Sequence, residues 1–242
     1  MLKILFENKN VIVCAKPHGV LSQRGAGGNG KDEDDMLSAV SSYIGREAGL
    51  LHRLDRPTGG IMVFSKNKNI EGRLSAAISD KSICTKEYLA VVSGKPEENC
   101  GEMRDLLFKD AAAGKSFVVS SPRKGAKEAV LYYEVLGTFE GEQGELSLVR
   151  IRLGTGRTHQ IRVQFSSRGM PIVGDGKYGS REKIRGEMEN GASPKDAIAL
   201  YAVRLSLGLK EAKFDISYFP DDKIYPFSLF SDFLADYIDK KG

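Results

Sequence analysis

The chain has 242 residues, of which 41% are hydrophobic and 28% charged, a balance that excludes a largely disordered protein. It is only mildly basic, with 36 Lys and Arg against 32 Asp and Glu. No apolar run approaches the ~18–20 residues that span a bilayer, and the N-terminus turns polar at Glu7, which argues against a secretory signal. We therefore expect one domain over residues 1–242, located in the cytoplasm, without a membrane partner.

The first half of the chain predicts a mixture of strands and short helices. Asp34 or Asp35 can cap a helix that begins near Met36. Asn67 can cap a second helix, since the apolar residues after it recur at helical spacing. Short apolar runs bounded by polar turns predict strands, the first two of which form a hairpin. These strands are residues 4–6, 11–13, 61–64 and 83–92.

The second half reads mostly as β-structure. Residues 103–153 predict several strands, and the clearest has Arg150 and Arg152 alternating with apolar residues. Thr158 can cap a helix that ends near Ser167. Further strands are expected over 199–207 and 214–219, and an amphipathic helix over 229–238. Strands without a regular βαβ alternation predict an α+β fold with a mainly antiparallel sheet flanked by helices.

Basic charge is concentrated in one stretch of the chain. Residues 147–174 contain five arginines and no Asp or Glu, although the whole protein has a net charge of +4. Arginine suits phosphate because its planar guanidinium donates in a fork. A solvated basic face is the alternative interpretation of the same stretch.

The cysteines and histidines do not suggest a metal site. No two of them share a ligand-type spacing, and there is no C-x-x-C pair, which fits reduced thiols better than a disulfide framework. They are Cys14, Cys84, Cys100, His18, His52 and His159.

A glycine-rich segment at residues 25–31 matches two phosphate-loop patterns, and both are rejected. In a Walker loop a Ser or Thr follows the lysine, but here Lys31 is followed by Asp32 and three more acidic residues, which would repel a triphosphate. A dinucleotide fingerprint needs a strand running directly into the glycines, and polar residues intervene. An exposed loop is the better interpretation.

Three other segments are candidates for chemistry. Asp55 stands between Arg53 and Arg56 before a Pro-Thr-Gly-Gly turn, where cationic neighbours favour the carboxylate form. By spacing alone, a surface ion pair is the favoured explanation. Residues 154–163 join glycines to a helix start, an arrangement that suits anions. Tyr88 lies on a strand with Lys86, which is also what an ordinary amphipathic strand shows.

Together these segments resemble the RluA-type pseudouridine synthases. The matching motifs occur in the family's order and run from about residue 4 to about residue 220. They are Lys16–Gly19 (KPHG), His52–Lys66 (HRLDRPTGGIMVFSK), Lys86–Tyr88 (KEY), Gly156–Val163 (GRTHQIRV), Gly169–Asp175 (GMPIVGD), Tyr178–Gly179 (YG) and Leu200–Ala202 (LYA).

The chain departs from the family pattern at three positions. Gly59 stands where Ser is usual, Gln164 where His is usual, and Tyr201 where His is usual. None of these changes removes a catalytic group, but they alter how the cleft is packed. The chain also begins at the first hairpin, so we expect no S4-like RNA-binding domain.

The resemblance implies an α+β fold with a central active-site cleft and an enzyme that converts uridine in RNA to pseudouridine without a cofactor. It implies that Asp55 is the catalytic carboxylate, that Arg162 pairs with it, with Arg157 as second choice, and that Tyr88 stacks on the uracil. The remaining implied residues contact RNA or support the site. RNA contacts are Arg53, Arg150, Arg152, Arg157 and Arg168, and supporting residues are Lys16, His52, Thr58, His159, Ile161 and Leu200.

Several alternatives stay open at this stage. Asp55 can act as a nucleophile or as a base, and the substrate can be ribosomal or transfer RNA, at one uridine or several. DNA is not an expected partner, and a monomer is expected. A non-catalytic RNA-binding or ribosome-assembly protein would keep the arginines but tolerate loss of Asp55. A nucleoside hydrolase would need an activated water and often a cluster of metal-binding carboxylates, which the sequence does not show.

Overall fold

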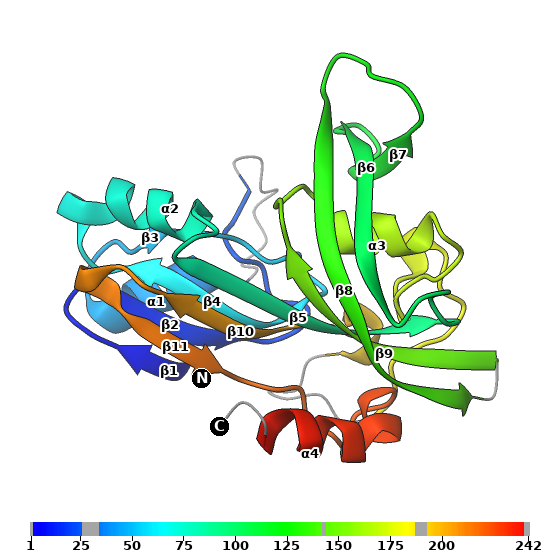
Figure 1. Ribbon diagram of the computed structural model, residues 1–242. Coiled ribbons are helices and arrows are strands. Elements are labelled where there is room, and N and C mark those ends of the chain that lie inside the picture. The colour runs from blue at the N-terminus through cyan, green and yellow to red at the C-terminus, as the bar shows by residue number, and fades with distance from the viewer. Residues whose placement is uncertain (1, 26–33, 142–143, 187–192, 240–242) are drawn as a thin grey trace. The chain divides into compact units, whose positions relative to one another are not determined.

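The computed structural model describes residues 2–25, 34–141, 144–186 and 193–239 (Figure 1). The chain divides into two compact units. The first contains Met1–Lys86, Met188–Ala197 and Tyr201–Pro220, and the second contains the rest of the chain. The expectation of a single domain over 1–242 stays a prediction. No helix in the described ranges is long and apolar enough to cross a membrane.

Strands outnumber helices in both units. The strands are β1 Lys3–Glu7, β2 Val11–Lys16, β3 Gly49–Leu50, β4 Gly59–Ser65, β5 Cys84–Ser93, β6 Cys100–Asp110, β7 Lys115–Val119, β8 Ala126–Gly141, β9 Gly144–Leu153, β10 Leu200–Leu207 and β11 Phe214–Ser217. The α-helices are α1 Met36–Ile44, α2 Glu71–Ser79, α3 Gln160–Ser166 and α4 Ser231–Asp239. Short 3₁₀ turns precede α2 (Lys68–Ile70) and α4 (Phe227–Phe230).

The first unit is built on the strands β1-β2-β4-β10 in that order, with β11 on β10 and β3 on β4. Among the described strand pairs of this unit, β4 and β10 run parallel and the others run antiparallel. Val13 lies opposite Val63 in the β2–β4 register. Both of these side chains point to the face that α2 covers with Leu74 and Ile78 (Figure 1). The expected hairpin over residues 4–13 is confirmed.

Both helices of the first unit follow from local sequence. The carboxylate of Asp35 accepts a hydrogen bond from the Ser38 N–H, which caps α1 as predicted, and Gly45 ends the helix with a φ of 67°. Asn67 also caps as predicted, but it caps the 3₁₀ turn that leads into α2 by accepting from the Asn69 N–H. The apolar stripe of the second helix therefore begins one turn before α2 proper.

The second unit is an antiparallel sheet in the order β5-β9-β8-β6-β7. The register of β8 on β9 shifts between Val135 and Gly137, which marks a bulge in the longest strand of the fold. One face of this sheet packs on α3, where Leu107 and Ala129 meet Val163 (Figure 1). The prediction that residues 103–153 are mostly β is confirmed.

The start of α3 differs from the sequence prediction. The helix predicted to be capped by Thr158 is α3, but its N-cap is His159, which has a left-handed φ of 54° and no side-chain capping bond. The prediction of Thr158 was wrong because the hydroxyl-cap rule ignores the tertiary contacts that hold this loop.

The glycine-rich segment 25–31 lies outside the described residues apart from Gly25.

Candidate active site

Asp55 lies in a tight turn between the buried Leu54 and β4. The Thr58 N–H donates to the Asp55 carbonyl over 3.0 Å, closing the turn. Asp55 is half-buried, whereas the flanking Arg53 and Arg56 are exposed. Leu54 is tied down because the Ser22 hydroxyl donates to its carbonyl and accepts from its N–H, at 2.7 and 3.0 Å. The carboxylate thus projects from a backbone that is fixed on its N-terminal side.

Lys16 fixes the other side of the same turn. Its ammonium is fully buried and donates to the carbonyls of Pro17, Val20 and Arg56, at 2.9, 2.7 and 3.0 Å. An ammonium has three N–H donors, so these three carbonyls satisfy it completely. Burial lowers the pKa of Lys16 to about 7, while the nearby Asp55 carboxylate acts in the opposite direction.

The rest of the KPHG segment also holds the turn. The Gly19 N–H donates to the Arg56 carbonyl, and the Arg56 Nε donates back to the Gly19 carbonyl, both at 2.9 Å. His18 Nδ1 lies 2.7 Å from the Pro57 carbonyl. Because a carbonyl only accepts, Nδ1 carries a proton. The segment predicted to support the active-site turn therefore contacts two consecutive residues of it.

His52 and Thr58 flank Asp55 with different local chemistry. The Val63 N–H donates to His52 Nε2 over 3.2 Å, so this nitrogen is unprotonated. Burial lowers the pKa of His52 well below its usual value, with the charges of Lys86 and Lys81 acting in the same direction. Thr58 is buried, and its hydroxyl has no hydrogen-bond partner in the described part of the chain.

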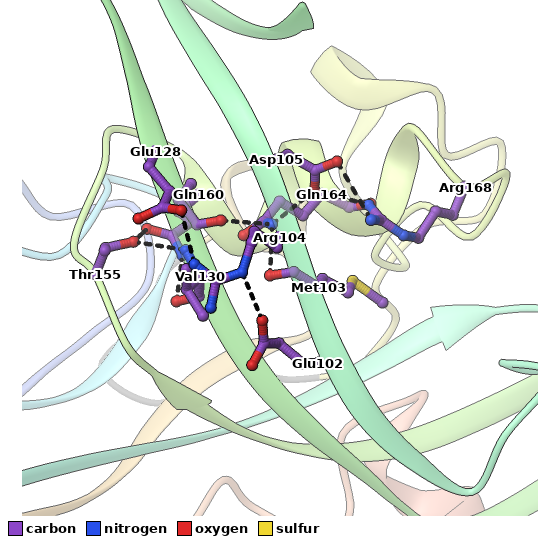
Figure 2. Close-up of polar contacts among 11 residues, drawn as sticks. Glu102, Met103, Arg104, Asp105, Glu128, Val130, Thr155, Gln160, Gln164 and Arg168 are labelled. Carbon is purple, nitrogen blue, oxygen red and sulfur yellow. Dashed lines mark hydrogen bonds and ion pairs between the residues drawn. The ribbon is translucent and has the colours of Figure 1, made fainter. Parts of the chain in front are cut away.

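In the second unit, the segment 154–164 is held to β8 by side-chain hydrogen bonds (Figure 2). The Gln160 Oε1 accepts from the Thr155 hydroxyl and from the Arg157 N–H, at 2.7 and 2.9 Å. The Gln160 amide nitrogen also donates to the Val130 carbonyl, and the Thr155 hydroxyl accepts from the Val130 N–H. Gln160 therefore ties the loop before α3 to β8, and no described side chain caps the helix itself.

Arg162 projects from α3 into a buried ion pair. Its Nε and Nη2 donate to the two carboxylate oxygens of Asp175 at 2.6 and 2.9 Å, and the side chains are 5% and 1% exposed. The guanidinium also lies 5.0 Å from the centre of the Tyr178 ring. The predicted pairing of Arg162 with Asp55 joins residues of the two separate units and stays a prediction.

Tyr178 connects this pair to the start of α3. Its hydroxyl oxygen accepts from the Ser116 N–H and lies 2.9 Å from His159 Nδ1. These contacts explain why His159, a predicted supporting residue, adopts a left-handed conformation at the helix start. Asp175 and Tyr178 were not among the predicted site residues, although both fall in quoted motifs. The only available signal was an Asp directly after a Pro-Ile-Val-Gly turn.

The strand register separates Tyr88 from two of the predicted RNA contacts. Tyr88 lies opposite Ile151 in the β5–β9 pairing, and both are buried. Because side chains alternate along a strand, Arg150 and Arg152 point to the other face of the sheet. Arg150 forms an ion pair with Glu134 there. Arg150 and Arg152 therefore cannot line the face that carries Tyr88.

The other arginines of the 147–174 stretch also contact their own unit. The Arg157 Nε donates to the Glu128 carbonyl over 2.8 Å, and its side chain is exposed. The Arg168 Nη1 donates to Asp105 Oδ2 over 2.9 Å, and Asp105 also accepts from the Gln164 amide (Figure 2). Much of the predicted basic face is thus paired within the fold. Ile161 and Leu200, two predicted supporting residues, are both buried.

The chain is similar to known proteins of one family. A sequence profile described as RNA pseudouridylate synthase matches residues 10–167. Ribosomal large subunit pseudouridine synthase C of Rickettsia felis is 34% identical over 179 residues, covering 74% of this chain and 56% of the relative. Ribosomal large subunit pseudouridine synthase D of Borreliella burgdorferi is 30% identical over 231 residues, covering 90% and 65%.

Among solved structures, human RNA pseudouridylate synthase domain containing 4 matches with a TM-score of 0.70 at 23% identity, covering 96% of this chain and 93% of that one. This likeness confirms the α+β fold and defines it as that of the pseudouridylate synthases. The chain belongs to the RNA pseudouridylate synthase family, which confirms the resemblance drawn from its motifs. It spans between 56% and 65% of the length of the two relatives named above.

Proposed function

We propose that the protein isomerises uridine in RNA to pseudouridine and that Asp55 is the catalytic carboxylate. The observation that carries the proposal is the Asp55 turn, which Lys16, His18 and Gly19 hold through hydrogen bonds to Arg56 and Pro57. These bonds fix the backbone from which the carboxylate projects, and fixed placement of a reacting group is one source of catalysis. Family membership supplies the reaction class.

The reaction is balanced without a co-reactant. The N1–C1′ bond of the nucleotide breaks, the uracil turns, and a C5–C1′ bond forms. The proton at C5 leaves and N1 gains one, so the product is an isomer of the substrate. Asp55 acts either as a nucleophile on the sugar or as the base that takes a ribose proton, and both roles need the ionised form. No metal or redox cofactor is part of the proposal.

Tyr88 and Arg162 have separate proposed roles. A uridine stacked in folded RNA must be flipped out at a cost of a few kcal/mol. Stacking on the Tyr88 ring returns roughly 1–3 kcal/mol of this cost. Arg162 presents a permanent positive charge that the ion pair with Asp175 already orients. Arg53 and Arg157, both exposed, are the phosphate contacts that we favour.

The substrate and setting are proposed more broadly. The two relatives named above are described as acting on the large ribosomal subunit, which makes ribosomal RNA the first substrate to test and transfer RNA the second. We propose that the protein acts as a monomer in the cytoplasm.

The test measures tritium release from RNA labelled at C5 of uridine. Unmodified large-subunit ribosomal RNA and bulk transfer RNA transcripts are each incubated with the wild type, with Asp55→Asn and with Asp222→Asn. Asp222 is exposed, so its variant is a control for the same chemical change. We expect Asp55→Asn to lose all release while its RNA affinity stays near wild type. Release by this variant would refute the assigned role.

The same experiment tests the non-catalytic alternative. An RNA-binding or ribosome-assembly protein on this fold would bind both transcripts and release no tritium in the wild type. Tyr88→Phe gives a finer result, because it keeps the stacking ring and removes the hydroxyl. We expect slower turnover with unchanged RNA affinity, whereas an unchanged single-turnover rate would exclude the hydroxyl from the reaction.

A further inference from the structure

The start of β4 is approached so closely by β10 that a side chain at Gly59 has no room. The two strands run parallel, with Tyr201 paired to Gly59 and Ala202 to Gly60. A Cβ atom placed on Gly59 would lie 2.5 Å from Tyr201 Cε2 and 2.8 Å from His18 Nε2. Such distances are far inside van der Waals contact. The rings of Tyr201 and His18 together therefore fill the space that a side chain at position 59 would need, and Tyr201 makes the closest approach.

Tyr201 is itself held in place by aromatic neighbours. It is buried, with 5% of its surface exposed. Its ring centre lies 5.5 Å from that of His18 and 5.9 Å from that of Tyr218. Lys3 adds a cation 4.4 Å from the Tyr218 ring centre. A ring packed in this way has little freedom to move, so its size sets the position of His18.

His18 passes this constraint on to the catalytic turn. Its other ring nitrogen, Nδ1, donates to the Pro57 carbonyl over 2.7 Å. Pro57 lies two residues after Asp55, inside the turn that the Thr58 N–H closes. A displacement of the His18 ring would therefore move the backbone that carries the carboxylate.

We propose that Tyr201 is a positioning residue for Asp55 and that it forms a size-matched pair with Gly59. The ring keeps His18 against the Pro57 carbonyl, and the missing side chain at Gly59 is what admits the ring. The pairing also explains two departures from the family pattern together, since a smaller ring at position 201 would leave room for Ser at position 59. The effect on rate rests on the proposed function, but the steric pair does not.

The test is a double-mutant cycle of Gly59→Ser and Tyr201→His, with Gly72→Ser as the matched control, because a side chain added at Gly72 meets open space. The single-turnover rate of tritium release, the RNA affinity and Tm are measured for each variant at a temperature where it is folded. A misplacement of about 1 Å costs on the order of 10²-fold in rate. We expect a loss of this order for Gly59→Ser with RNA affinity unchanged, and we expect Gly72→Ser to stay near wild type.

The double variant decides between coupling and simple damage. We expect Gly59→Ser/Tyr201→His to recover on the order of tenfold in rate over Gly59→Ser, and to recover Tm as well. If Gly59→Ser does not fold, folding of the double variant is the same rescue. Additive losses in both rate and Tm would overturn the proposal. If the wild type releases no tritium, the proposed function fails, and the Tm cycle still tests the pair.

Discussion

Among the residues that the structure describes, Lys16 in the first unit and Arg162 in the second are buried cations, and the two are neutralised in different ways. Lys16 in the first unit is fully buried and donates to three backbone carbonyls. Arg162 in the second unit is 4% exposed and donates with two nitrogens to the carboxylate of Asp175. The first charge is held by dipoles and the second by a full opposite charge.

The difference shows that the two cations suit different tasks. Carbonyl dipoles compensate a buried charge only partly, which is why the pKa of Lys16 falls to about 7. Its charge is therefore reversible near neutral pH. A guanidinium stays protonated at any physiological pH, and a bidentate pair fixes its orientation. Lys16 is suited to hold a backbone turn, and Arg162 to present a permanent, aimed charge.

The largest effect is expected when the buried ion pair between Arg162 and Asp175 is broken. Arg162→Met leaves Asp175 buried and uncompensated, which destabilises by about 3–5 kcal/mol. The free energy of unfolding from urea titration measures this loss. Arg104→Met is the control, because Arg104 forms exposed ion pairs with Glu102 and Glu128 and should change stability by less than about 1 kcal/mol. Equal losses in the two variants would show that burial does not strengthen the Asp175 pair.

Removing the donor to the three carbonyls around Lys16 should destabilise the protein less. Lys16→Met leaves three carbonyls without their donor but no unpaired charge, so we expect a loss of about 1–3 kcal/mol in the free energy of unfolding. Tritium release should fall as well, because the turn that carries Asp55 loses the hydrogen bond from Lys16 to the Arg56 carbonyl. The exposed Lys68, which pairs with Glu47, provides the control variant Lys68→Met. A Lys16→Met protein as stable as the wild type would show that the three hydrogen bonds of Lys16 do not stabilise the fold.

The pH dependence separates the two cations directly. Between about pH 7 and pH 10 the unfolded chain keeps a proton on Lys16 that the folded chain has released, so stability from this group rises with pH. The slope is at most about 1.4 kcal/mol per pH unit. The difference in unfolding free energy between the wild type and Lys16→Met should therefore increase over this range. A constant difference would mean that Lys16 stays protonated.

The smallest effect is expected at Thr58, a buried polar group that neither carbonyl dipoles nor an opposite charge compensates within the described structure. The Thr58 hydroxyl is buried and has no partner among the residues that the structure describes. Thr58→Val keeps the shape and removes the unsatisfied oxygen, so we expect a gain of about 1 kcal/mol in stability. Weaker RNA binding by the same variant would indicate that the hydroxyl contacts substrate. A loss of stability would show that it has a partner in solution.

Local rules predicted most elements of both units. The Asp35 cap, the β1–β2 hairpin and the strand-rich middle of the chain depend on neighbours in sequence, so pattern was sufficient. The start of α3 was misassigned because its N-cap, His159, is placed by contacts with Tyr178 rather than by a side-chain cap. Contacts of that kind leave no periodic trace in the sequence.

The site was predicted less completely than the fold. Motifs led to roles for Asp55, Lys16 and Arg162. Asp175 was assigned no role although it ends a quoted motif, because an ion partner after an irregular loop has no characteristic spacing. The position of Arg150 on the face opposite Tyr88 depends on the pairing of β5 with β9, which is a property of the register rather than of either strand alone.

The parallel pairing of β4 with β10 has a consequence for biosynthesis. The Asp55 turn and Gly59 are translated before Tyr201, whose ring lies against the space at Gly59 and which follows strands β5 to β9 in the chain. Pairings so distant in sequence form late during folding. A nascent chain therefore holds Asp55 in an unfinished setting until residue 201 has been translated.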